Sequence, residues 1–286
     1  MSKAPRSAAR AVSRRRLMAA GGMVAVGVPT AGAIDGVFVT PRRLHTTDQA
    51  VAGRSPRADA TLRLTQVSDL HLHRIGHLET QLLAALHDSR ADVIVFTGDM
   101  LDRRVDLSQL DTFLRECPTG PRRFAILGNW EYDARVPRDT LERLYASHGI
   151  ELLVNRSVEF STASTRVRIT GLDDLRAGTP DMEAALRDAM PAPNHLVLAH
   201  CPLSRDVVAM PAAHPVDLLL AGHTHGGQVA PFGLALALPA GSGRYVAGWY
   251  RDAGPPMYVS RGIGTSLIPM RLGATPELVR FEWALA

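Results

Sequence analysis

The sequence predicts an α/β protein whose chemistry gathers at the carboxyl ends of its strands. Short apolar runs have the length of buried strands, and helical patterns lie between them. Strands that alternate with helices favour an α/β fold, in which ligands collect beyond the carboxyl ends of the strands. The five apolar runs are Leu62–Val67, Val93–Phe96, Phe124–Leu127, Leu196–Leu198 and Leu218–Leu220.

Four segments between the runs carry apolar residues on one helical face, which predicts amphipathic helices. Beyond about residue 225 the sequence alternates apolar residues with Gly and Pro turns, and it predicts further strands. The helical faces are Leu78, Leu82, Leu83 and Leu86; Leu107, Leu110 and Leu114; Leu141, Leu144 and Tyr145; and Met182, Ala185 and Leu186.

The composition narrows the function classes. The formal charge is +4, but six of the 32 Lys and Arg residues fall in residues 1–33, which hold no Asp or Glu. The remaining 26 face 28 acidic residues, a net charge of −2, which argues against nucleic acid as a partner. Lys3 is the single lysine, so a Walker loop and Schiff-base chemistry are excluded from the body of the chain. Cys117 and Cys201 lack zinc-finger spacing, so any metal site must use oxygen and nitrogen ligands.

The amino terminus resembles a twin-arginine (Tat) export signal. Residues 13–18 read SRRRLM, and a charge-free run rich in Ala and Gly follows to residue 33. We therefore expect export by the Tat machinery to the periplasm, the cell wall or the outer face of the cytoplasmic membrane. The alternatives are cleavage of residues 1–33 and their retention as a membrane anchor. Residues 34–60 are interpreted as a lead-in linker, and residues 61–286 as the catalytic domain.

Each apolar run is followed at once by a residue that can ligate a metal. Burying several such side chains without a metal or a partner would be costly. The glycines of GHTHGG, residues 222–227, would let the backbone turn sharply and approach the site. The sequence therefore predicts a metal cluster built from Asp69, His71, Asp99, Asn129, His200, His223 and His225.

These residues form ordered blocks: D-x-H, GD, GN, a single His and GHxH. The order and spacing resemble those of the calcineurin-like metallophosphoesterase superfamily. The segments GLDD, MYVSRGIGTSLIPMR and PELVRFEW are similar to a bacterial branch represented by YkuE and YaeI, whose members are often exported or membrane-anchored. The resemblance covers residues 61–286. It implies a four-layer α-β-β-α sandwich of two mixed sheets, with a dinuclear metal site at the carboxyl ends of strands.

The resemblance also implies the ligands and their roles. One divalent ion would be held by Asp69, His71 and His225, and the second by Asn129, His200 and His223, with Asp99 bridging them. Asp99, Asn129 and His200 would be the catalytic residues. Mixed nitrogen and oxygen ligands suit Mn, Fe, Zn or Ni.

The activity implied is hydrolysis of phosphoric ester bonds by a hydroxide that the two metal ions activate. The enzyme would be a phosphodiesterase or pyrophosphatase-like enzyme of the cell envelope, acting on a small-molecule, lipid or cell-wall substrate, with membrane association. The alternatives are a UDP-2,3-diacylglucosamine pyrophosphatase-type enzyme of lipid A synthesis, a nuclease-like phosphodiesterase, and a metal-binding protein without turnover.

One position departs from the superfamily pattern. Trp130 follows Asn129, where many members have a His that is thought to protonate the leaving group. An indole N–H does not titrate near neutrality and cannot serve as the acid. Another donor, such as Glu131, Tyr132 or His73, or a good leaving group must therefore compensate. The histidines outside the motifs are interpreted as surface or packing residues: His45, His77, His87, His148, His195 and His214.

Overall fold

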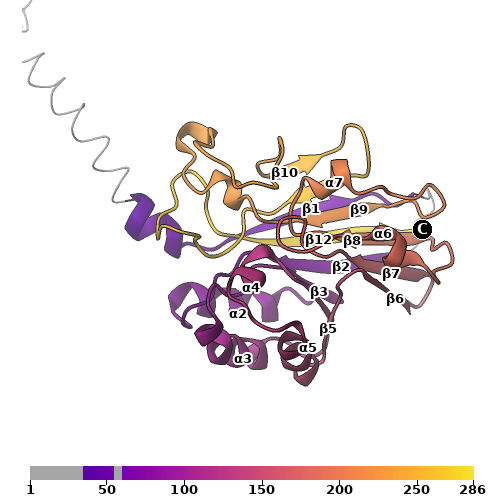
Figure 1. The fold of residues 1–286 in the computed structure, drawn as a ribbon, viewed down its shortest axis with the longest axis horizontal. Coiled ribbons are helices and arrows are strands. Elements are labelled where there is room, and N and C mark those ends of the chain that lie inside the picture. The colour runs from indigo at the N-terminus through magenta and orange to yellow at the C-terminus, as the bar shows by residue number, and fades with distance from the viewer. Residues whose placement is uncertain (1–34, 55–59) are drawn as a thin grey trace, which may run out of the picture.

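The computed structural model describes residues 35–54 and 60–286 of the chain. Two six-stranded sheets face each other, and helices lie on the outer side of each (Figure 1). One apolar cluster fills the space between the sheets, and two further clusters lie between the sheets and the helices. The structure confirms the predicted α/β class and the four layers.

The first sheet consists of β1 (His45–Val51), β2 (Ala60–Val67), β3 (Val93–Thr97), β4 (Arg122–Ile126), β5 (Ile150–Leu152) and β12 (Glu277–Leu285). Its strand order is β1-β12-β2-β3-β4-β5. Strands β2 to β5 are parallel, whereas β12 is antiparallel to β2. The first three predicted runs are thus neighbouring parallel strands, and their carboxyl ends share one edge of the sheet.

The second sheet consists of β6 (Arg156–Ser161), β7 (Arg166–Gly171), β8 (Asn194–Leu198), β9 (Leu218–Ala221), β10 (Gly248–Tyr250) and β11 (Met257–Val259). Its strand order is β10-β11-β9-β8-β7-β6. Strands β7, β8, β9 and β11 are parallel, and β6 and β10 are antiparallel edge strands. The last two predicted runs, β8 and β9, are central in this sheet.

Helices form where the sequence shows amphipathic patterns, although the later ones are short. Leu78, Leu82 and Leu86 are buried on the face of one helix that packs on the first sheet. The helix that follows β6 and β7 has only five residues, and its buried side chains pack on the outer face of the second sheet. The α-helices are α2 (His77–Asp88), α3 (Leu107–Glu116), α4 (Asn129–Asp133), α5 (Arg138–Ser147), α6 (Met182–Leu186) and α7 (Ser204–Val207).

The interpretation of residues 34–60 as a linker is wrong for residues 45–51. These residues form β1, which pairs in parallel with β12 along its whole length. The sequence, HTTDQAV, is polar, and most of its side chains are exposed or half-buried. An edge strand of this kind has no apolar alternation, so it can be recognised only by its partner.

The predicted export signal lies outside the described residues. Within residues 35–54 and 60–286, no helix is both long and apolar enough to cross a membrane.

Candidate metal centre

The predicted ligands lie together where the two sheets meet. Strands β2, β3 and β4 deliver three of the five strand ends, and β8 and β9 deliver the other two from the facing sheet. The site therefore forms between two sheets, where the carboxyl ends of both converge. All seven side chains are buried: Asp69, His71, Asp99, Asn129, His200, His223 and His225.

Five of the seven predicted ligands lie on strained backbone. Asp69, His71, Asp99, His223 and His225 all have φ between 47° and 71°. Residues other than glycine adopt this left-handed region at a cost, and such strain concentrates at functional sites. Hydrogen bonds hold the strained loops in place: the amide of Asp69 donates to Gly98, and that of His71 donates to Asp99.

Two glycines let neighbouring loops come close, Gly222 between the two sheets and Gly128 within the first sheet. A β-carbon on Gly222 would overlap Ser68 Oγ and the Asp69 carboxylate, and one on Gly128 would overlap the Asp99 carboxylate. This crowding explains why glycine precedes both His223 and Asn129 in the sequence.

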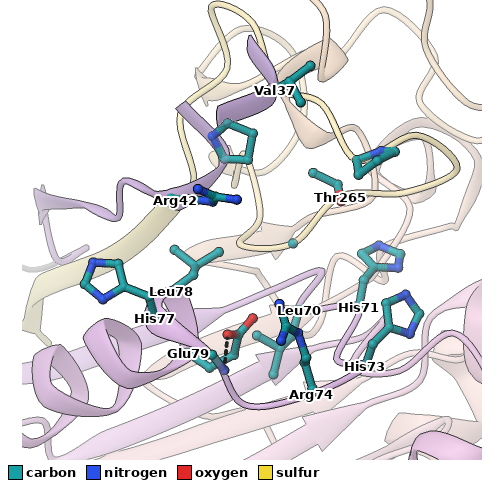
Figure 2. Close-up of a pocket in the computed structure, with 14 residues that line it drawn as sticks. Val37, Arg42, Leu70, His71, His73, Arg74, His77, Leu78, Glu79 and Thr265 are labelled. Atoms are coloured by element: carbon teal, nitrogen blue, oxygen red, sulfur yellow. Dashed lines mark hydrogen bonds between the residues drawn. The ribbon is translucent and has the colours of Figure 1, made fainter. Parts of the chain in front are cut away.

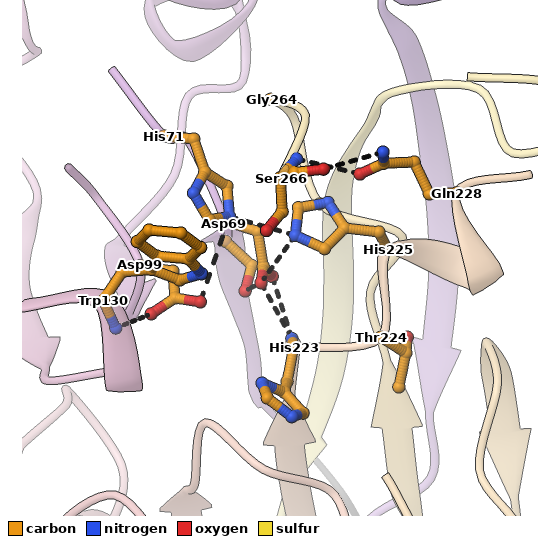
Figure 3. Close-up of polar contacts among 12 residues, drawn as sticks. Asp69, His71, Asp99, Trp130, His223, Thr224, His225, Gln228, Gly264 and Ser266 are labelled. Carbon is orange, nitrogen blue, oxygen red and sulfur yellow. Dashed lines mark hydrogen bonds and ion pairs between the residues drawn. The ribbon is translucent and has the colours of Figure 1, made fainter. Parts of the chain in front are cut away.

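The first cluster contains Asp69, His71 and His225 (Figure 3). His71 Nε2 lies 3.0 Å from His225 Nε2, and His225 Nε2 lies 3.6 Å from Asp69 Oδ1. Two imidazole nitrogens and a carboxylate oxygen therefore face one point. This donor set suits a divalent cation.

The second cluster contains Asp99, His200 and His223. Asp99 Oδ2 lies 3.0 Å from His200 Nε2, and His200 Nε2 lies 3.2 Å from His223 Nδ1. The side-chain amide of Asn129 is 3.0 Å from the same His223 nitrogen. Asp99 Oδ2 is also 3.9 Å from His71 Nε2, so this oxygen lies between the two clusters.

Three of the four imidazoles turn one nitrogen away from the centre, onto an acceptor. The outer nitrogen of His200 lies 2.8 Å from the Thr97 carbonyl, and that of His223 lies 2.7 Å from the Ala240 carbonyl. The outer nitrogen of His71 contacts the carboxylate of Asp102. An N–H fixed on an outer acceptor leaves the inner nitrogen with a free lone pair. The residues therefore fit two divalent ions.

His225 has a different outer partner. Nη2 of the fully buried Arg271 lies 3.0 Å from His225 Nδ1. The same guanidinium donates to the backbone carbonyls of Gly264, Arg261 and Ala274. Burial lowers the pKa of Arg271 to about 9. The side chain thus ties the loop around residues 261–274 to a predicted ligand.

The predicted ligands influence one another's protonation. Burial would raise the pKa of Asp99, but the imidazoles of His200 and His71 lower it to about 2. Burial would lower the pKa of His200, yet Asp99 raises it well above 6.5. Burial and then the neighbouring His71 lower the pKa of His225 well below 6.5. Protons and cations would compete for the same atoms.

Glu131 supports the site from behind. Its buried carboxylate accepts hydrogen bonds from the backbone amides of Asp99, Met100 and Gly128. Burial and then the charge of Asp99 raise the pKa of Glu131 to about 7. The side chain caps α4 and joins the loop after β3 to the loop after β4. The contacts with Asp99 and Met100 depend on tertiary structure, so the sequence alone does not reveal this role.

Asp173 and Asp174, the two acidic residues of the GLDD segment, accept hydrogen bonds from backbone amides of the turn that follows β7. Asp174 Oδ1 accepts from the amides of Arg176 and Ala177. Its other oxygen accepts from Cys201 Sγ, which accounts for that buried thiol beside His200.

A cavity of about 640 Å³ lies beside His71 (Figure 2). Its wall includes His73 and His77 together with the basic side chains of Arg42 and Arg74. His77, interpreted from the sequence as a surface or packing residue, is therefore part of this wall.

We expect Asp102→Asn to lower metal affinity about 10–100-fold, the usual effect of losing such an outer partner. The change keeps the shape of the side chain but removes the charge that faces His71 Nδ1. Asp102 also lies 3.1 Å from His73, which in turn contacts Asp106. Asp106→Asn is therefore the matched control, because Asp106 contacts His73 and Arg103 but does not contact His71. Calorimetric metal titration should separate the two variants, and equal affinities would contradict the role of Asp102.

The four-layer fold and the two buried His/Asp clusters are consistent with a hydrolase that uses a dinuclear metal site. The chain belongs to the calcineurin-like phosphoesterase family, whose sequence profile matches residues 62–227. It is therefore a metallophosphoesterase, a hydrolase.

Two bacterial relatives support the same assignment. The metallophosphoesterase YkuE of Bacillus subtilis is 29% identical over 270 residues, which cover 91% of this chain and 93% of YkuE. The phosphodiesterase YaeI of Escherichia coli is 30% identical over 229 residues, covering 78% of this chain and 82% of YaeI. Among solved structures, a 5′-nucleotidase precursor from Thermus thermophilus matches with a TM-score of 0.48 and 14% identity, over 78% of this chain and 55% of that chain.

Proposed function

We propose that this metallophosphoesterase hydrolyses phosphodiester or pyrophosphate bonds in a phosphorylated substrate of the cell envelope. The seven predicted ligands would hold two divalent ions, of Mn, Fe, Zn or Ni. The observation that carries this proposal is the position of Asp99 Oδ2, 3.0 Å from His200 Nε2 and 3.9 Å from His71 Nε2. One carboxylate oxygen that reaches both clusters supports a bridging role.

Two bound ions would supply Lewis acidity for the phosphoryl oxygens and an activated water. Three of the four imidazoles have outer acceptors, so once the histidines are neutral Asp69 and Asp99 are the only charged ligands in the two clusters. The low ligand charge would preserve the acidity of the ions. Arg42 and Arg74, on the cavity wall, would bind the anionic remainder of the substrate.

A substrate panel on metal-reconstituted protein tests the proposal. It should include phosphodiesters, phosphomonoesters, single-stranded DNA and nucleotide-sugar pyrophosphates, among them UDP-2,3-diacylglucosamine. We expect metal-dependent cleavage of diesters or pyrophosphates that a chelator abolishes. Binding of two ions without turnover of any substrate would instead indicate a metal-binding protein, and preference for DNA would indicate a nuclease.

Trp130 allows a sharper prediction about the leaving group. Its ring lies edge-on to His71 with centroids 5.8 Å apart, so it borders the first cluster. A missing general acid typically costs about 10²–10⁴ in rate, and the loss is greatest for poor leaving groups. We therefore expect Trp130→His to accelerate cleavage of alkyl esters more than cleavage of aryl esters. Trp249→His, a change in β10, is the matched control.

The contacts of the three alternative proton donors favour one of them. Glu131 is buried with three backbone partners, and the Tyr132 hydroxyl donates to Asp173. His73, half-exposed on the cavity wall, is the remaining candidate among those named from the sequence. Wild-type rates that do not depend on the leaving-group pKa would contradict the Trp130 hypothesis and favour His73 or a bound water.

Export through the Tat pathway is part of the proposal and rests on residues 13–33 of the sequence. Because the receptor reads the arginine pair and not charge alone, we expect Arg14→Lys together with Arg15→Lys to block export. Arg6→Lys with Arg10→Lys is the matched control. Fractionation of the cells measures the outcome, and unchanged export of the first variant would point to another route.

A further inference from the structure

The exposed apolar side chains of this protein are concentrated at one end. Ten large apolar side chains are exposed within the described residues, and seven of them lie on three short segments, residues 37–39, 232–236 and 267–268. The most exposed are Phe232, at 99%, and Leu267, at 89%. We call the seven side chains the apolar rim: Val37, Val39, Phe232, Leu234, Leu236, Leu267 and Ile268.

Hydrogen bonds join the three segments into one surface. The side-chain amide of Gln228 donates to the backbone carbonyls of Ser266 and Ile268. The amide of Arg271 donates to the Gly36 carbonyl over 2.8 Å. Figure 1 shows the segment at residues 35–39, the 3-10 helix at residues 231–233 and the yellow C-terminal loop at the same end of the molecule. The apolar rim is thus one face assembled from distant parts of the chain.

Two rim residues hold their exposed positions at a conformational cost. Phe232 has φ of 56° and Leu267 has φ of 62°, although both carry bulky side chains. When such a side chain is exposed to water, its burial does not offset the free-energy cost of the strained backbone. Exposed apolar side chains gathered on linked segments in this way are typical of an interaction surface.

The rim also borders the cavity beside the metal centre. Val37 belongs to both, and the cavity wall continues through Thr265 and Pro269, next to Leu267 (Figure 2). Arg42 and Arg74, both exposed, bring positive charge to the same wall. A surface that combines apolar side chains with arginines suits an anionic lipid bilayer.

The route of the chain favours the same partner. The charge-free apolar run at residues 17–33 ends just before Asp35, where the described structure begins within the rim segment. If residues 17–33 associate with a membrane, the rim segment follows them in the chain after only a few residues and therefore stays close to the bilayer.

We propose that the apolar rim docks onto the surface of an anionic lipid bilayer, so that the cavity and the metal centre open towards the membrane. Phe232, Leu267 and their neighbours insert among the lipid headgroups, and Arg42 and Arg74 face the lipid phosphates. The proposal concerns the surface and does not depend on which phosphate ester is cleaved.

Site-specific labelling of the full chain tests this proposal. Cys117 and Cys201 are buried, so a thiol-reactive fluorophore will label the exposed site in a Leu267→Cys variant selectively. A Met190→Cys variant is the matched control, because Met190 is 71% exposed and precedes β8, at the end of the sheet opposite the metal centre. The probe is a vesicle of phosphatidylglycerol and phosphatidylcholine, with a nitroxide quencher on the lipid chains and iodide in the water.

With vesicles present, we expect the label at 267 to be quenched by the lipid nitroxide and protected from iodide, and the label at 190 to stay open to iodide. Equal iodide access at both positions would overturn the proposal. Protection at 267 before vesicles are added would overturn it too, because a segment of the same chain or a second copy would then cover the rim.

A double variant, Phe232→Asn with Leu267→Asn, removes the two most exposed rim side chains. Asn tolerates the left-handed backbone at both positions, so the fold should be retained. We expect the half-saturating lipid concentration to rise about tenfold or more, since two apolar side chains no longer insert. Turnover of a soluble aryl phosphodiester should match that of the wild type. If the half-saturating lipid concentration did not change, the role of the rim would be overturned. If the wild-type protein did not hydrolyse the soluble phosphodiester at all, that result would contradict the proposed function but not the docking of the rim.

Discussion

Asp99→Asn is expected to reduce turnover by about 10³-fold or more and to lower the metal content from near two ions per chain. The carboxylate lies between the two clusters, and its Oδ2 approaches His200 Nε2 at 3.0 Å and His71 Nε2 at 3.9 Å. The asparagine side chain keeps the shape of the aspartate and can still accept the hydrogen bond from the backbone N–H of Trp130 at Oδ1. It lacks the negative charge, and an NH₂ group replaces the second oxygen that would coordinate a metal ion. Metal analysis and steady-state kinetics on the same preparation measure both effects.

Asp88→Asn is the matched control for this prediction. Asp88 ends α2 and is exposed, so the same chemical change there should leave activity and metal content unaltered. If Asp99→Asn retained two ions and full activity, Asp99 could not be the bridging ligand.

Glu131→Ala is expected to lower the free energy of unfolding by about 3 kcal/mol, because it strands three buried amide donors at about 1–3 kcal/mol each. Those donors belong to Asp99, Met100 and Gly128. The burial cost of the carboxylate, visible in its pKa of about 7, offsets part of the loss and keeps the expected value at the low end.

Two variants calibrate this measurement. Glu131→Gln keeps one acceptor oxygen and should lose less stability than Glu131→Ala. Glu142→Ala, in the exposed part of α5, removes only an ion pair with Arg138 and should change stability by less than about 1 kcal/mol. Denaturant unfolding at fixed metal content ranks the three. A loss for Glu131→Ala no larger than that for Glu142→Ala would contradict the supporting role of Glu131.

The sequence by itself determined five of the strands, β2, β3, β4, β8 and β9, together with their order along the chain and the residues at their ends. Each of these features is local: an apolar run predicts a buried strand, and the next few residues contain the glycine and the candidate ligand. The glycines of residues 128 and 222 are informative for the same reason, since a β-carbon there would overlap the carboxylates of Asp99 and Asp69. The twin-arginine pattern is likewise readable from the sequence, and it stays a prediction.

Only the tertiary structure decided which residues support the ligands and what surrounds them. Asp102, Glu131 and Arg271 contact the site through partners that the sequence does not reveal, because no local periodicity links a residue to the distant group it meets. Strand β1 forms through pairing with β12, more than 200 residues away in the chain. The apolar rim is also assembled from three separated segments. Local sequence patterns predict the apolar strands, the amphipathic helices and the residues that end the strands. Long-range packing decides where the supporting charged side chains, the edge strand β1 and the apolar rim lie.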